Sequence, residues 1–204
     1  MTRSRPPGPA AKTDGRLNRS IVTRKRIVDA LTALIYEGQL TPTAEQVATR
    51  ADVGLRTVFR HFDDMDALYR EIALDLDTVI QPVIGQRLSG ATWQDRLRHS
   101  VVLRTEFFDR VAALHLATQV HRHESDYLTQ QVKQSVDLQR ELLRRQLPPE
   151  VAQDATLFDA LDVVLSIEVW IRLRREQRLP ADAARQVILR TVAGLLQSGS
   201  ASTG

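Results

Sequence analysis

Residues 43–62 read TAEQVATRADVGLRTVFRHF, the pattern of two short helices joined by a tight turn. Thr43 can cap the first helix, and Gln46, three residues later, can return a hydrogen bond to the Thr43 amide, as in a capping box. The turn falls at Asp52 and Gly54, because Asp tolerates a left-handed φ and Gly is an acceptable helix N-cap. The stretch therefore predicts a helix-turn-helix.

The second helix is expected to begin near Leu55 and to have two different faces. Its apolar side chains recur at helical spacing and are predicted to face the core: Leu55, Val58, Phe59 and Phe62. The side chains predicted to contact duplex DNA are Arg56, Thr57, Arg60 and His61, with Thr43 at the start of the motif. The alternative is a helical hairpin whose outer face is polar only because it meets solvent.

With its flanks, the segment 20–68 resembles the N-terminal domain of the tetracycline-repressor (TetR) family of bacterial regulators. The family's first-helix pattern, TRxRIxxAxxxLxxxxG, is matched by Thr23, Arg24, Arg26, Ile27, Ala30, Leu34 and Gly38. Its next pattern, TxxxIAxxAxVSxxTxYxxF followed by KxxL, is matched by Thr43, Val47, Ala48, Ala51, Val53, Thr57, Phe59, Phe62 and Leu68. The match covers about a quarter of the chain.

Three positions depart from the family pattern. Gly54 replaces a capping Ser, Phe59 replaces a Tyr that often contacts phosphate, and Met65 replaces a Lys that often does so. Each departure removes a contact to the DNA backbone. Arginine side chains are therefore expected to carry more of the affinity, and Arg24 is included among the expected DNA contacts.

The resemblance implies an all-α protein of about nine helices, three of them in a DNA-binding head. It implies a homodimeric transcriptional regulator, a repressor released from a palindromic operator by a small-molecule effector. It also implies that the long helix after the head moves like a pendulum and changes the spacing of the two heads.

Charge is distributed unevenly along the 204 residues. Residues 1–62 hold 11 Lys and Arg against 5 Asp and Glu, net +6, whereas residues 63–204 hold 17 against 20, net −3. A basic module joined to an acidic one is typical of a nucleic-acid-binding domain attached to a regulatory domain. The absence of cysteine excludes disulfides and thiolate zinc sites.

Four regions are expected. Residues 1–18 are predicted to be a flexible basic arm, which either follows the DNA backbone or minor groove or is a solvated tail. Residues 19–67 form the helix-turn-helix domain, 68–198 the ligand-binding and dimerisation domain, and 199–204 a disordered tail. The N-terminus lacks the apolar region of a signal peptide and no segment could span a membrane, so a cytoplasmic location is expected.

Periodicity predicts the helices of the second domain. One long helix is expected from 64 to 84, and one over 126–147. Two helices are expected between 92 and 123, with a break near Thr105. The segment 155–176 is apolar on nearly every face, which indicates burial on two sides, and a last helix is expected over 181–197.

A ligand pocket is predicted where aromatic side chains mix with a few polar ones in the second domain. Its candidate residues are Phe107, Phe108, His115, Thr118, Gln119, Tyr127 and Trp170. The aromatic members could equally be core residues. The expected effector is apolar or amphipathic.

No catalytic, metal or cofactor site is expected. His115, His121 and His123 stand six and two residues apart, so their side chains point from different helix faces, and no carboxylate pair completes a metal site. The acidic pairs lack a partnered His or Ser, which argues against general acid–base catalysis.

Dimerisation is predicted through the helix around 163–173 and the last helix, packed against their copies as a four-helix bundle. The interface candidates are Leu161, Leu165, Val187, Val192 and Leu195. The alternative is that these residues belong to the core of one chain. At the level of function, the alternatives are a helical ligand-binding or adaptor protein without DNA regulation, and an enzyme with a DNA-binding head.

Overall fold

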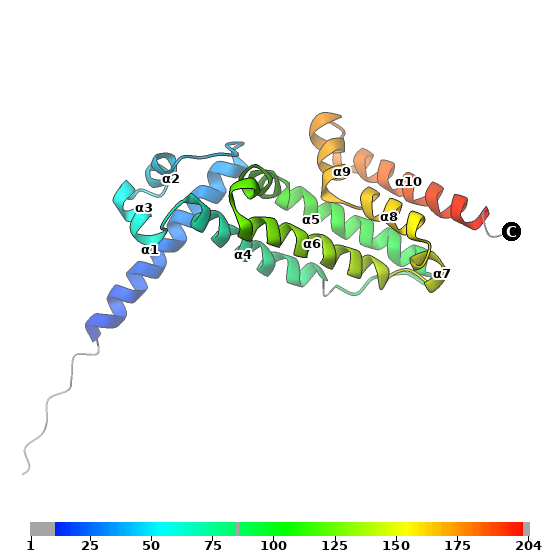
Figure 1. Cartoon of the computed structure of the whole chain (residues 1–204), viewed down its shortest axis with the longest axis horizontal. Coiled ribbons are helices and arrows are strands. Elements are labelled where there is room, and N and C mark those ends of the chain that lie inside the picture. Colours follow the sequence, from blue (N-terminus) through cyan, green and yellow to red (C-terminus); the bar gives the residue numbers. More distant parts are fainter. Residues whose placement is uncertain (1–10, 85, 202–204) are drawn as a thin grey trace, which may run out of the picture. The chain divides into compact units, whose positions relative to one another are not determined.

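The computed structural model of the chain describes residues 11–84 and 86–201, with side chains inside helices described for 17–74 and 86–198. The described residues form ten α-helices and two short turns of other helix types, without a strand (Figure 1). The predicted all-α fold is confirmed. No described helix has both the length and the apolar character needed to cross a membrane.

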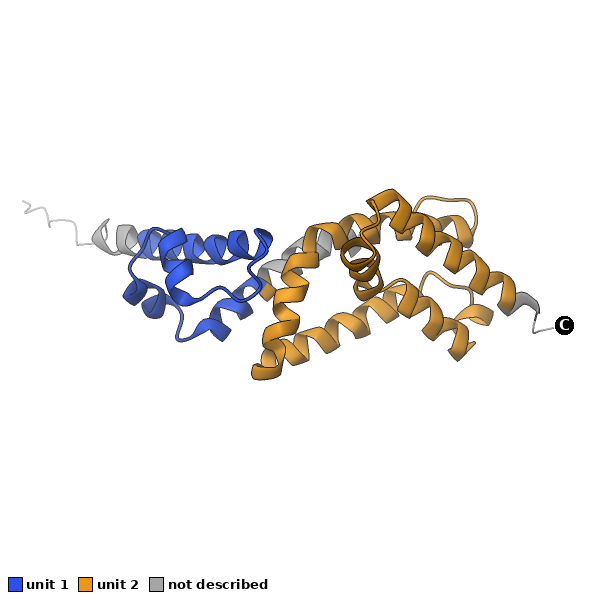
Figure 2. Cartoon of the chain, turned by 90° about the horizontal axis from the view of Figure 1, so that it is seen from above, with its two compact units in different colours: residues 1–72 blue, residues 73–204 orange. Residues whose placement is uncertain are grey.

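The chain divides into two compact units, residues 1–72 and 73–204 (Figure 2). Unit 1 contains α1 (Ala11–Tyr36), α2 (Ala44–Arg50), α3 (Leu55–His61) and the first turns of α4 (Met65–Ile84). Helix α2 packs against both α1 and α3. The core of unit 1 is built from apolar side chains of all four helices, among them Ile27, Leu31, Val47, Val58, Phe62, Leu68 and Ile72.

Helix α1 begins at Ala11, eight residues before the predicted start at Arg19. Residues 11–18, expected to be part of a flexible arm, are therefore helical. The physical reason is that extending an existing helix fixes only one residue for each hydrogen bond gained, whereas starting a new helix fixes several. Residues 1–10 lie outside the described residues.

Unit 2 is a bundle of helices. It contains α5 (Trp93–His121), the 3-10 turn η1 (Arg122–Glu124), α6 (Asp126–Arg144), α7 (Pro149–Ala152), α8 (Ala155–Val164), α9 (Ile167–Ile171), the π-helical turn η2 (Arg172–Glu176) and α10 (Ala181–Ala201). Helix α10 packs against α8 and α5, while α5 also packs against α9, and α8 against α6 and α7. Trp170 is fully buried at the centre of this core.

Helix α5 is one continuous helix, where two helices were predicted. Its start was located correctly, since Thr92 and Asp95 form a capping box. The break expected near Thr105 does not occur, because the Thr105 hydroxyl donates to the Val102 carbonyl and accepts from Arg185 Nε. With its hydroxyl satisfied in this way, a buried threonine is tolerated inside a helix.

The apolar segment 155–176 is broken at Leu165, which ends α8. Ser166 caps α9 by accepting a hydrogen bond from the Val169 amide, so the chain changes direction between two apolar runs. Helix α10 extends to Ala201, so the predicted tail at 199–204 is helical over its first three residues, and 202–204 lie outside the described residues.

Candidate functional sites in the two units

The helix-turn-helix of unit 1 is built from its capping residues upward. The Gln46 amide donates to Thr43 Oγ1 at 3.3 Å, and the Thr43 amide donates to Gln46 Oε1 at 2.8 Å, which completes the predicted capping box of α2. The turn has Asp52 at φ +52° and Gly54 as the N-cap of α3 without a side-chain hydrogen bond. Both features were predicted from residue type.

Arg26 of α1 holds this turn in place. Its Nη2 donates to the Ala51 carbonyl at 2.5 Å and to the Asp52 carbonyl at 3.2 Å, and it lies 3.6 Å from the Asp52 carboxylate. Carbonyl groups at the end of α2 would otherwise lack donors. The family-pattern arginine at this position thus fixes the angle between α2 and α3.

The outer face of α3 carries Arg56 and Arg60, both exposed, whereas Thr57 and His61 are half-buried. Neither arginine forms an ion pair with a described residue. Together with exposed Thr43 at the start of α2, these side chains gather on one motif, as predicted.

Two residues predicted to face inward do not. Leu55 is 36% exposed and Phe59 is 47% exposed, whereas Val58 and Phe62 are buried. Helix α3 has seven residues and packs on one side, so it buries only a narrow strip of side chains. Phe59 lies about 100° around the helix from buried Val58 and therefore falls outside that strip. Phe59 therefore adds an exposed aromatic ring to the arginine face.

The imidazole of His61 is held neutral near pH 7. Partial burial lowers the pKa of His61, and the positive charges of Arg60 and Arg24 lower it further. The neutral ring of His61 can donate one hydrogen bond and accept another at a DNA surface, but it adds no positive charge there.

Arg24, predicted to contact DNA, forms several contacts inside unit 1. Its guanidinium forms a two-pronged ion pair with Glu71 of α4 at 3.1 and 2.8 Å. It also donates to the His61 carbonyl at 2.6 Å and lies 4.1 Å from the centre of the Phe62 ring. Because these contacts join three helices, Arg24 anchors the end of α3 to α1 and α4.

Replacing Arg24 by alanine is expected to loosen α3. The change leaves Glu71 and the His61 carbonyl without this donor, which should cost about 1–2 kcal/mol after allowance for the solvent that reaches the pair. Hydrogen exchange of peptides covering 55–62 should then accelerate about 5–30-fold. The control is Lys25→Ala, which removes an exposed ion pair with Asp29 and should change exchange little. Equal exchange in both variants would contradict the anchoring role.

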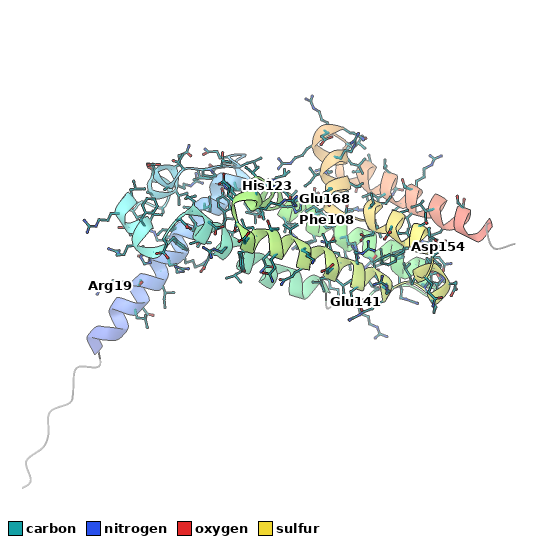
Figure 3. The ribbon with its side chains drawn as sticks, in the orientation of Figure 1. Arg19, Phe108, His123, Glu141, Asp154 and Glu168 are labelled. Atoms are coloured by element: carbon teal, nitrogen blue, oxygen red, sulfur yellow. The ribbon has the colours of Figure 1, made fainter. Side chains whose placement is uncertain are left out.

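Unit 2 contains a cavity of about 460 Å³ between α5, α6, α8 and α9. This volume lies within the range of roughly 300–1,000 Å³ typical of small-molecule sites. Phe108 and Glu168, both labelled in Figure 3, are among the lining residues. The apolar walls also include Phe107, Val111, Val132, Val136, Val163 and Ile167.

Polar side chains of α5 and α9 form one end of this cavity. His115 Nε2 lies 3.3 Å from a Glu168 carboxylate oxygen and 3.3 Å from Gln119 Nε2, so its ring bridges α5 and α9. The hydrogen bond from His115 is the largest cause that lowers the pKa of Glu168, which keeps this carboxylate charged near pH 7. Thr118 also lines this end.

Four of the seven predicted ligand residues line the cavity: Phe107, Phe108, His115 and Thr118. Gln119 and Tyr127 do not line the cavity themselves, but each contacts a residue that does. Gln119 lies against His115, and the Tyr127 hydroxyl accepts a hydrogen bond from Gln131. Trp170 does not line it. Its ring is buried in the core with Nε1 donating to Asp109 at 3.0 Å, so the core alternative holds for this aromatic residue.

The polar wall supplied by α6 was not predicted. Gln131, Ser135 and Gln139 stand four residues apart, and therefore lie on one face of the helix and point into the cavity. The spacing was visible in the sequence as a polar stripe on a helix that also has an apolar face. Nothing in the sequence indicated that these polar side chains face the cavity instead of solvent.

The predicted dimer residues divide into two groups. Leu161, Leu165 and Val192 are buried in the core of the single chain. A side chain already covered by its own chain cannot contact a second copy, so these three are corrected to core residues. Val187 is 42% exposed and Leu195 is partly buried, so both retain surface that a partner could cover.

Comparisons with known proteins bear on the fold. No family model matches the chain, and no match is found among curated proteins. Among solved structures, the chain is similar to a protein of Pseudomonas aeruginosa PAO1 described as a candidate transcriptional regulator. The two share 19% sequence identity with a TM-score of 0.61, over 84% of this chain and 89% of that one. At this identity the similarity supports the fold.

Proposed function

We propose that this protein is a DNA-binding transcriptional regulator of the TetR type that acts as a repressor. The observation that carries the proposal is the α2–turn–α3 motif, in which Arg56 and Arg60 stand exposed while Val58 and Phe62 fix the opposite face of α3 in the core. The description of the structurally similar Pseudomonas protein as a candidate transcriptional regulator supports the same class.

In this proposal the repressor is a homodimer. A single short recognition helix contacts few base pairs, so two heads with their centres about 34–36 Å apart are needed to read a palindrome. The surface proposed for self-association is formed by α8 and α10, which pack together and leave Val163 and Val187 exposed at 61% and 42%. Exposed valines on neighbouring helices suit an apolar interface between two copies.

The cavity of unit 2 is proposed as the effector site. Helix α4 contributes residues 65–72 to unit 1 and 73–84 to unit 2, so one continuous helix belongs to both units. An effector that favours a conformation with the wrong head spacing would release the operator. A coupling of about 1–3 kcal/mol corresponds to operator binding weakened about 5–150-fold.

Selection of duplexes from sheared genomic DNA by the full-length chain tests the DNA-binding function. The selected site should be a palindrome bound at least about 10³-fold more tightly than a scrambled duplex, and added salt should weaken binding. Equal affinity for selected and scrambled duplexes would contradict the proposal. It would favour the second candidate function, a helical ligand-binding or adaptor protein without DNA regulation, for which the cavity is the supporting observation.

Linkage between the sites is a separate prediction. For any small molecule that binds the cavity and weakens operator binding, the operator should weaken binding of that molecule by the same factor. Titration calorimetry with and without the operator duplex measures both affinities. Ligand affinity that is identical in the two titrations would refute coupling and leave the DNA-binding assignment intact.

A further inference from the structure

A second, smaller cavity of about 160 Å³ adjoins the large one and has an arginine in its wall. The two cavities share Phe107, Phe108, Ser135 and Gln139, so the same side chains border both. Arg104 of α5 lines the small cavity, one helical turn before Phe107 and Phe108. It is half-buried.

Arg104 forms no hydrogen bond or ion pair with any described residue. Several other arginines of unit 2 are paired, as Arg140 is with Asp159 and Asp162, and Arg174 with Asp109. Buried charges in proteins are ordinarily paired, because an isolated charge loses its hydration without compensation. An unpaired guanidinium beside two phenylalanines is therefore a candidate binding group.

The Asp162 carboxylate does not satisfy Arg104. Asp162 attracts it through space, but an Asp162 oxygen is already bonded to Arg140 at 2.8 Å. Burial is the dominant influence on Arg104 and lowers the pKa of its guanidinium, yet an arginine side chain stays charged in proteins. The small cavity consequently contains a positive charge whose donors are available to a ligand.

A second polar group of the same cavity also lacks a partner. The side-chain oxygen of Gln146 is buried and accepts no hydrogen bond from the described residues. Since the two ends of an amide can exchange by rotation, Gln146 can present either its oxygen or its NH₂ group to a ligand head. Arg104 and Gln146 thus place a guanidinium and a side-chain amide in the wall of the same small cavity.

The large cavity determines which way a ligand would lie. Its walls are mainly apolar, and its far end holds the charged Glu168 carboxylate paired with His115. Asp162 also lines the large cavity, with one carboxylate oxygen bonded to Arg140. A negative head group would be repelled by Glu168 and by Asp162, and attracted by Arg104. An apolar chain, by contrast, fits between Phe108, Val132 and Ile167.

We propose that the joined cavities bind an amphipathic organic carboxylate, its head bidentate to Arg104 and within reach of Gln146, its apolar chain lying in the large cavity. This inference names the ligand class for the effector site and rests on the proposed function for its regulatory meaning. Planar two-pronged bonds to a carboxylate are the geometry for which an arginine fork is suited.

Isothermal titration of the full-length chain with dodecanoate, dodecan-1-ol and dodecylammonium tests the inference. Dodecanoate should bind wild type most tightly, and Arg104→Met should weaken dodecanoate binding about 10–150-fold while leaving dodecan-1-ol unchanged. The matched control is Arg98→Met, on the same helix but with its arginine exposed and paired to Asp95, which should bind dodecanoate as wild type does.

The unfolding midpoint of Arg104→Met without ligand gives an independent readout. It should equal or exceed that of wild type, because the change removes a half-buried charge that has no partner among the described residues. If Arg104→Met does not fold, Arg104→Gln replaces it in both measurements. A clearly lower midpoint of the folded variant would then assign Arg104 a structural role and overturn the inference. Dodecanoate binding unaffected by loss of Arg104, or tighter binding of dodecylammonium, would also overturn it.

These titrations contain no DNA, so their outcome is separate from that of the proposed regulatory function. Arg104-dependent binding of dodecanoate by a protein that selects no duplex would support the ligand site and reject the regulator. Selective duplex binding by a protein that does not bind dodecanoate would support the regulator and reject the ligand site.

Discussion

Replacing Arg56 and Arg60 together by alanine is expected to abolish selective duplex binding while the fold is retained. Each arginine that forms a bidentate contact with guanine contributes about 1–3 kcal/mol of discrimination, so the double variant should lose affinity by between one and four orders of magnitude. Both side chains are exposed, and removing them uncovers no core surface. Fluorescence titration with the selected duplex measures the loss, and circular dichroism checks the fold.

The control for this experiment removes the same charge from unit 2. Arg98→Ala together with Arg145→Ala deletes two exposed arginines that pair with Asp95 and Glu141. This variant should bind the selected duplex almost as wild type does. If the Arg56 and Arg60 variant also retained full affinity, the outer face of α3 would not be the DNA-contacting surface.

Leu165→Asp is expected to unfold the protein, whereas Val187→Asp should leave it folded and separate the two copies of the dimer. Leu165 is buried at the end of α8, so an aspartate there loses hydration and leaves a cavity. The combined loss of several kcal/mol is a large share of the 5–15 kcal/mol that stabilises a typical domain. Val187 is exposed on α10, and its replacement places a charge in the proposed interface without disturbing the core.

Two measurements distinguish these outcomes. Circular dichroism should show loss of helix for Leu165→Asp and a wild-type spectrum for Val187→Asp. Native mass spectrometry at micromolar concentration should give a dimer for wild type and a single chain for Val187→Asp. A single-chain mass for wild type would refute the dimer, and an undisturbed dimer in Val187→Asp would show that α10 is not in the interface.

The fold could be predicted where local rules decide it. The capping box at Thr43, the left-handed turn at Asp52 and the cap at Thr92 each depend on residues a few positions apart, and all three are present. Helix periodicity located the elements of unit 2 but could not tell that Thr105 would be satisfied by Arg185, 80 residues later. The predicted break at Thr105 was wrong for that reason.

The candidate sites were predictable only in part, because burial is a tertiary property. An apolar side chain has the same sequence signature in a core, a cavity wall or an interface, so Trp170 and Phe108 were grouped together although one is core and the other lines the cavity. Arginines pose the same difficulty. Arg24 was predicted to contact DNA, and nothing in the sequence indicated that it also bonds Glu71 and the His61 carbonyl.

The ion pairs of unit 1 change what its basic charge means for association with a polyanion. Arg24, Lys25, Arg26 and Arg50 each lie against a carboxylate of the same unit, so their charge is already balanced before any duplex approaches. Counterion release depends on phosphates newly neutralised, with a slope of about −0.9 in log affinity against log salt for each. The salt dependence per head should therefore reflect a few contacts such as Arg56 and Arg60, and be much shallower than the eleven Lys and Arg of residues 1–62 suggest.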